Sequence, residues 1–209
     1  MKERGTQMVK QTFCIFAVLV LAAASVYAEE EKYSNSVLGV SVVKPPGWSF
    51  ITKEEMLDSF APSDLKEAVM KMLLKYATAP LVSMTKYKEP YDDINPIFTL
   101  HIQPLNSFDA SDPKVIVEAS ASSLSMMLQD FKIVQGPENT IIKGRIAGYM
   151  RINHLMKVPD GRTFIICSES WIIPRANYFF MVEAATRQDE KTGTRDEIQG
   201  ILNSLVIEN

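Results

Sequence analysis

The chain has 209 residues, a net charge of −3 at neutral pH and a hydrophobic content of 46%. A mildly acidic protein lacks the basic face that phosphate backbones require, so we expect no nucleic-acid partner. Only two cysteines and two histidines are present, which limits the scope for a disulfide framework or a metal centre.

Residues 1–28 have the pattern of a secretory signal peptide. Three basic residues precede an apolar run over residues 13–24, and Val26-Tyr27-Ala28 offers a small-x-small cleavage site. The alternative is an uncleaved anchor, but the 16 residues from Phe13 to Ala28 fall short of the ~20 that a membrane-spanning helix needs. We therefore expect cleavage before Glu29.

The mature chain is then expected to be exported, either to the periplasm or to the medium, and to fold as a single domain over residues 29–209. The leader is bacterial in character, because it lacks the long Ser- and Arg-rich composition of a plastid transit peptide. Its removal leaves a net charge of −5, which argues against anchoring to anionic lipid. Cys167 is then the only cysteine, and its apolar neighbours predict a buried thiol.

The first half of the mature chain combines short strands with two helices. We expect strands over residues 33–36, 40–43, 48–51, 81–88 and 97–105. Thr52 and Glu55 have capping-box spacing, which predicts a short helix over residues 53–59. Apolar residues that recur at intervals of three and four predict a second helix from residue 62 or 63 to about residue 76.

The second half begins with the longest predicted helix, which Asp112 caps and Pro113 opens, and which runs to about residue 130. Its inner face is predicted to carry Ile116, Ala119, Ser123, Met126, Met127 and Phe131. Strands are expected over residues 131–134, 140–143, 147–158, 162–174 and 177–186. Asp160-Gly161 marks a tight hairpin turn, and a last helix, capped by Thr194 or Asp196, precedes a short final strand.

This order of elements predicts an α+β fold. Strands joined by tight turns must pair antiparallel, so the later strands should meander in one sheet. Amphipathic helices are expected to cover one face of that sheet and to leave the other face partly exposed for binding.

Three segments resemble the PsbP-like family. Residues 33–42 (YSNSVLGVSV) and Pro46-Gly47-Trp48 are similar to the opening of its domains, and residues 201–205 (ILNSL) are similar to its closing helix. The resemblance covers the whole mature chain and implies a central antiparallel sheet flanked by helices, an α/β/α sandwich. Family members include photosystem II extrinsic subunits, a Ran-binding nuclear import factor and exported bacterial proteins. Most bind or assist other proteins, so the resemblance implies an accessory role and identifies no site residue.

Four residues are the candidates for a metal site: His101, His154, Glu169 and Glu183. A metal site requires such imidazoles and carboxylates to converge. One interpretation of the strand alternation places the two histidines on opposite surfaces of the sheet, and the spacing from Cys167 and Trp171 predicts that Glu169 is partly buried. The competing interpretation, which we favour, is that these are ordinary strand histidines and paired carboxylates.

No catalytic motif accompanies these residues. The sequence has neither a G-x-S-x-G nucleophile motif nor a glycine-rich phosphate loop. We therefore expect an exported, non-catalytic binding or accessory protein, with no cofactor, no stable membrane insertion after cleavage and a protein partner in the cell envelope. Two alternatives stay open: a small-ligand or metal-ion carrier in the cell envelope, and a hydrolase whose site has no recognisable motif.

Overall fold

The computed structural model describes residues 31–52, 55, 80–105, 112–158, 160–192 and 195–208. The predicted signal peptide and the two helices predicted before residue 77 lie outside these residues, apart from Glu55. The predicted capping box is confirmed at its described ends. The Glu55 backbone N–H donates to Oγ1 of Thr52 (3.2 Å), and the Thr52 N–H donates to Oε2 of Glu55 (2.8 Å).

Within the described residues, seven antiparallel strands form the main sheet in the order β3-β4-β5-β9-β8-β7-β6. The strands are β3 (Ser49–Ile51), β4 (Val82–Thr85), β5 (Ile97–Pro104), β6 (Gln129–Ile142), β7 (Arg145–Lys157), β8 (Thr163–Pro174) and β9 (Tyr178–Arg187). The last four strands meander, as their tight turns predict, and β9 then lies beside β5. The predicted antiparallel α+β fold is therefore confirmed.

The early and late parts of the described chain meet in a smaller sheet. It consists of β1 (Lys32–Asn35), β2 (Val40–Val43) and β10 (Val206–Ile207), in the order β1-β2-β10. Just beyond β10, the Glu208 N–H donates to the carbonyl oxygen of Gly39 (2.7 Å). Val40, Val42 and Ile207 are buried in the same core as the main sheet, so the small sheet closes that core.

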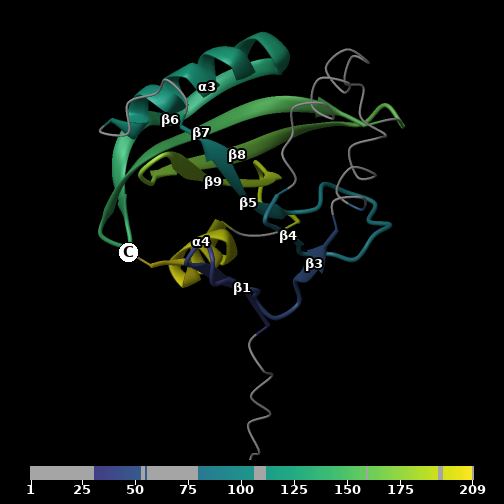
Figure 1. Cartoon of the computed structure of the whole chain (residues 1–209). Coiled ribbons are helices and arrows are strands. Elements are labelled where there is room, and N and C mark those ends of the chain that lie inside the picture. Colours follow the sequence, from purple (N-terminus) through teal and green to yellow (C-terminus); the bar gives the residue numbers. More distant parts are fainter. Residues whose placement is uncertain are drawn as a thin grey trace, which may run out of the picture.

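Each face of the main sheet carries a helix (Figure 1). α3 (Pro113–Met127) lies on one side, whereas α4 (Arg195–Ser204) and the small sheet lie on the other. The strands bury apolar side chains on both faces of the sheet. Ile172 packs in the core beneath α3, whereas its neighbour Trp171 packs in the core beneath α4. The prediction that helices cover only one face was therefore wrong. The α/β/α arrangement implied by the resemblance is the one observed.

The predicted inner face of α3 is confirmed only in part: Ile116 is buried, as predicted, and Phe131 packs against the same core from β6. The buried residues of α3 are Pro113, Ile116, Val117 and Ala121. Ala119, Ser123 and Met126 were assigned to the inner face by spacing, but all three are exposed, and Met126 keeps 82% of its accessible surface. The helix has small residues on several sides, so apolar spacing alone did not define one stripe.

Gly148 of β7 sets how closely α3 approaches the sheet. A β-carbon at this position would lie 2.5 Å from the carbonyl oxygen of Pro113 and 2.6 Å from Cγ2 of Val117. Both separations are shorter than real side-chain contacts, so only a glycine lets the first turn of α3 rest on the strand.

β6 is one edge strand where the sequence predicts two. Residues 135–139, which separate the two predicted strands, lie inside β6, and the pairing with β7 shifts register between Ile133 and Gln135 and again across Gly136-Pro137. Proline is tolerated here because an edge strand pairs along only one side of its backbone.

Candidate functional site

The structure separates the four predicted metal candidates into three places. His101 and Glu183 lie together on the α3 side of the sheet, with 3.6 Å between Nε2 and Oε2. His154 lies on the same side, but it is four residues along β7 from Met150, which is in register with Ser170 and Glu183, a distance of ~13 Å along the strand. Glu169 lies on the α4 side, opposite Ala184 and beside Trp171.

Cross-strand register explains why the two histidines share a face. His101 pairs with Met181, Met181 with Ile172, and Ile172 with Gly148. These four residues lie in one row across four strands, so their side positions are on the same face of the sheet. His154 is an even number of residues from Gly148 and therefore points to the same side. The interpretation that placed the histidines on opposite surfaces was wrong, because alternation within one strand does not give the register between strands.

His101 and Glu183 form a pair without a third metal-binding side chain among the described residues. Among the described residues, no group of three or more His, Cys, Asp or Glu side chains converges. Two protein ligands leave a transition metal such as zinc short of the three or four that its protein sites normally supply.

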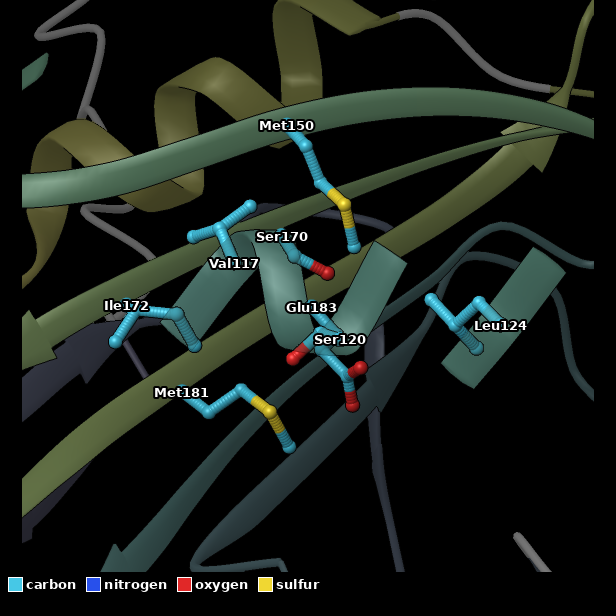
Figure 2. Close-up of a pocket in the computed structure, with 8 residues that line it drawn as sticks. All are labelled: Val117, Ser120, Leu124, Met150, Ser170, Ile172, Met181 and Glu183. Atoms are coloured by element: carbon cyan, nitrogen blue, oxygen red, sulfur yellow. The ribbon is translucent and has the colours of Figure 1, made fainter. Parts of the chain in front are cut away.

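A small pocket lies between α3 and the sheet beside this pair (Figure 2). Its lining, shown in Figure 2, consists of Val117, Ser120, Leu124, Met150, Ser170, Ile172, Met181 and Glu183. The cavity measures about 20 Å³, which is room for about one water molecule. Desolvation raises the pKa of the Glu183 carboxyl and His101 opposes the rise. The Glu183 side chain is 44% exposed, so solvent screens part of the influence of burial and of His101 on its pKa.

The order of the polar residues here does not match a hydrolase triad. Ser170 pairs directly with Glu183 across β8 and β9, and His101 lies beyond Glu183 on β5. In a triad the imidazole lies between the hydroxyl and the acid, so that it can accept the proton of the hydroxyl. Here the acid occupies the middle position. The nearby Ser120 hydroxyl donates to the carbonyl oxygen of Ile116 (3.0 Å), within its own helix.

A second polar cluster lies on the α4 side, around Glu169. Tyr149 donates its hydroxyl to Oε2 of Glu169 (2.7 Å), and Nε of Arg195 donates to Oε1 (2.5 Å). Glu169 was predicted to be partly buried, and at 7% exposure it is more deeply buried than predicted. Both carboxylate oxygens therefore have a charged or polar partner, as burial of an ionised group requires. Burial, followed by the bond to Glu169, raises the pKa of Tyr149 far above its ordinary value.

Sequence reasoning identified Glu169 but missed its two partners. Tyr149 pairs with Trp171 across β7 and β8, and the two rings stack with centroids 5.4 Å apart. Arg195 comes from the start of α4, 26 residues further along the chain. The one available signal was the even spacing of Glu169 and Trp171, which places both side chains on one face.

A wider pocket opens beside the Glu169 cluster. It is lined by Glu169, Trp171, Arg195, Asp196, Ile198 and Gln199, and its volume is about 130 Å³. This space can take several waters or a small polar molecule. Its lining is mostly polar, because Trp171 is only 4% exposed, the Arg195 guanidinium is paired with Glu169, and Asp196 adds a second carboxylate.

His154 is buried and incompletely hydrogen-bonded. It is 8% exposed, and its Nε2 lies 3.3 Å from Oγ of Ser168. Its Nδ1 is buried without a hydrogen-bond partner. Burial lowers the pKa of His154, so the neutral ring is the form that the fold favours.

Comparison with known proteins gives a fold and no closer relationship. No protein-family model matches the chain, and no curated protein matches it in sequence. Among solved structures, LpqN of Mycobacterium tuberculosis, which is involved in cell envelope biogenesis, aligns with a TM-score of 0.52 at 11% identity. That alignment covers 87% of this chain and 86% of LpqN.

Two further solved structures align with lower scores. The cyanobacterial PsbP of Synechocystis has a TM-score of 0.48 at 12% identity, over 85% of this chain and 92% of that protein. The Saccharomyces cerevisiae Ran-binding protein Mog1p has a TM-score of 0.48 at 9% identity, over 85% of this chain and 95% of that protein.

The fold is PsbP-like. The match to LpqN, the one of the three above 0.5, carries this conclusion, and identities this low show the fold alone. The predicted resemblance is therefore confirmed at the level of the PsbP-like fold. Within the described part of the chain, no helix combines the length and the apolar character that crossing a bilayer demands.

Proposed function

We propose that this chain is an exported, non-catalytic accessory protein that acts by binding in the cell envelope. The observation that carries the proposal is the state of the buried Glu169 carboxylate. Glu169 is held by Tyr149 and Arg195, in an arrangement that stabilises the fold and leaves neither carboxylate oxygen without a donor. A general acid or base must instead be able to exchange its proton with a substrate.

The fold and the sequence support the same proposal. The fold is shared with LpqN, a protein involved in cell envelope biogenesis, and a signal-peptide pattern precedes the domain. The order Ser170, Glu183, His101 on the α3 side favours binding over hydrolysis, because the imidazole is not next to the hydroxyl.

In-cell cross-linking tests the binding role. We expect the chain, cross-linked in living cells and recovered from the envelope fraction, to appear reproducibly in one covalent complex of higher mass. A cross-linker-treated sample in which the chain is recovered only as its own monomer, at normal expression, contradicts the proposal.

The wider pocket supports a second candidate, a carrier of a small polar ligand. The pocket of about 130 Å³ is lined by Arg195, Asp196 and Gln199, whose donors and acceptors suit a small polar ligand. Native mass spectrometry of the chain purified from its cells should then show an added mass, and Gln199→Trp, which fills the pocket, should remove it. A bare mass for both proteins excludes the carrier function.

A further inference from the structure

Three turns are tied together at the end of the molecule where β6 turns into β7. The Glu208 carbonyl oxygen accepts hydrogen bonds from Nη2 of Arg145 (3.3 Å) and from Nη1 of Arg175, and its N–H donates to Gly39. Arg145 follows the β6–β7 turn, Arg175 belongs to the β8–β9 turn, and Gly39 belongs to the β1–β2 turn. Figure 1 shows the C-terminal end beside the β6–β7 hairpin. The hairpin is therefore held at a defined position.

This hairpin exposes a pair of isoleucines. Ile141 and Ile146 lie directly opposite each other on β6 and β7, and they are 63% and 55% exposed. They share the face of Gly148, over which α3 begins, but Ile146 lies two residues further out. The first turn of α3 lies over Gly148, and the pair two residues further out is exposed.

The turn between them is compact and carries a positive charge. Lys143 and Gly144 have φ values of 49° and 77°, and positive values at both central positions are typical of the type I′ hairpin turn. Lys143 is exposed. We define the hairpin tip as Ile141, Lys143, Gly144 and Ile146.

The basic side chains of Lys143 and Arg175 are not paired with carboxylates of described residues in the way seen at the opposite end of β7. There, Arg162 bonds to Asp92 and Asp160, and Arg187 bonds to Asp93 and Asp189. Arg175 instead donates to the backbone carbonyl oxygen of Glu208, and Lys143 has no ion pair with a described residue. The Glu208 carboxylate lies beside Gly39 and is the acidic group of this cluster, against the three basic residues Lys143, Arg145 and Arg175. The chain is acidic overall, but an approaching surface meets the local charge first.

We propose that the hairpin tip, together with Arg175, docks this protein on an anionic membrane surface. Exposed aliphatic side chains flanked by basic ones suit the boundary between acyl chains and anionic headgroups. Two isoleucines fall far short of the ~800 Å² per partner of a standard protein interface, so a protein partner is less favoured here. The inference deepens the proposed accessory role by naming its docking surface, and rests on that role only for the compartment.

Vesicle sedimentation tests the proposal. The processed chain, purified from the exported fraction and checked by mass, is mixed with phosphatidylcholine vesicles, with and without phosphatidylglycerol at about one part in four. We expect binding to the anionic vesicles, weaker binding in high salt and little binding to pure phosphatidylcholine. Ile141→Ser with Ile146→Ser should lower the partition coefficient at least ~10-fold, and Lys143→Glu should lower it ~3- to 10-fold.

Matched exposed isoleucines elsewhere supply the control. Ile133 and Ile165 are 42% and 52% exposed, and Ile133→Ser with Ile165→Ser should leave the binding unchanged. An environment-sensitive dye on Ile146→Cys should shift to the blue with anionic vesicles, and buried Cys167 should stay unlabelled. Equal losses in the tip and control variants, or no binding by the wild-type chain, overturn the proposal. A protein cross-linked through position 146 without vesicle binding also overturns it, and leaves the accessory role standing.

Discussion

At the scale of single residues, Glu169 is the side chain whose surroundings matter most to the fold. Removing the Tyr149 hydroxyl leaves Oε2 of buried Glu169 without its donor, so Tyr149→Phe should destabilise the protein by ~1–3 kcal/mol. Glu169→Gln should cost at least as much, because Arg195 then loses its counter-charge. Urea unfolding of the two variants and their double mutant measures the coupling. Additive losses contradict a shared cluster.

The sequence predicted the burial of Glu169 but not its partners. Alternation along β8 placed Glu169 and Trp171 on one face, and this is a local property of the chain. The bonds to Tyr149 and Arg195 depend on the register of β7 and on the position of α4, which are set by tertiary packing.

Gly148 offers a sharper test at the same scale. Gly148→Ala should destabilise the protein by ~1–3 kcal/mol, because the added carbon meets Pro113 and Val117 at 2.5 and 2.6 Å. Gly200, inside α4, has no atom within 4 Å of the corresponding position. Gly200→Ala should therefore stabilise the protein by ~0.5–1 kcal/mol. Thermal or urea unfolding compares the two, and a neutral Gly148→Ala rules out the close approach of α3.

His154 predicts a dependence of stability on pH. Its pKa in the folded state lies below the ordinary value of 6.5, so the unfolded chain binds a proton at this residue first as the pH falls. The stabilising effect of the neutral ring is complete above pH 6.5 and is lost as the pH falls through the interval down to the folded pKa. His154→Gln should therefore lose less stability than wild type between neutral and acidic pH. Parallel losses in the two proteins contradict the assignment.

At the scale of elements, α3 shows where periodicity is insufficient. The helix has apolar or small residues on more than one side, and the sequence favoured the side that includes Met126. In the structure Val117 is fully buried, whereas Met126 is 82% exposed. The deciding contact is with Gly148, which is distant in the sequence and therefore invisible to helical spacing.

Two substitutions on α3 distinguish its two sides. Val117→Ala should destabilise the protein by ~1–3 kcal/mol through the lost packing and the cavity, whereas Met126→Ala should change stability by less than ~0.5 kcal/mol. Chemical denaturation gives both values. A larger loss of stability for Met126→Ala than for Val117→Ala would contradict the observed packing and support the inner face predicted from spacing.

β6 shows a second limit of local reasoning. Gly136 and Pro137 are strong breakers by type, and they predict an interruption. Their position at the edge of the sheet removes the usual penalty, because the outer side of the strand has no ladder to complete. Turn chemistry was more reliable: Asp160 accepts the Arg162 N–H (2.9 Å) and Gly161 has a φ of 87° in the predicted hairpin turn.

At the scale of the whole molecule, the sequence predicted the fold class and the antiparallel meander, because both follow from strand patterns and tight turns. It did not predict that β9 returns to β5 or that β10 closes a second sheet with β2. Both pairings join segments far apart in the chain, and no local pattern specifies such partners. The candidate site depends on the same long-range pairings, which bring His101 to Glu183 and leave His154 apart.

The N-terminal residue of the chain recovered from its cells tests the central claim most directly, since an accessory role in the cell envelope presupposes export. N-terminal sequencing should find a chain that begins at or near Glu29, in the envelope fraction or in the medium. A chain that begins at Met1 or Lys2 and is recovered in the cytosolic fraction contradicts the account.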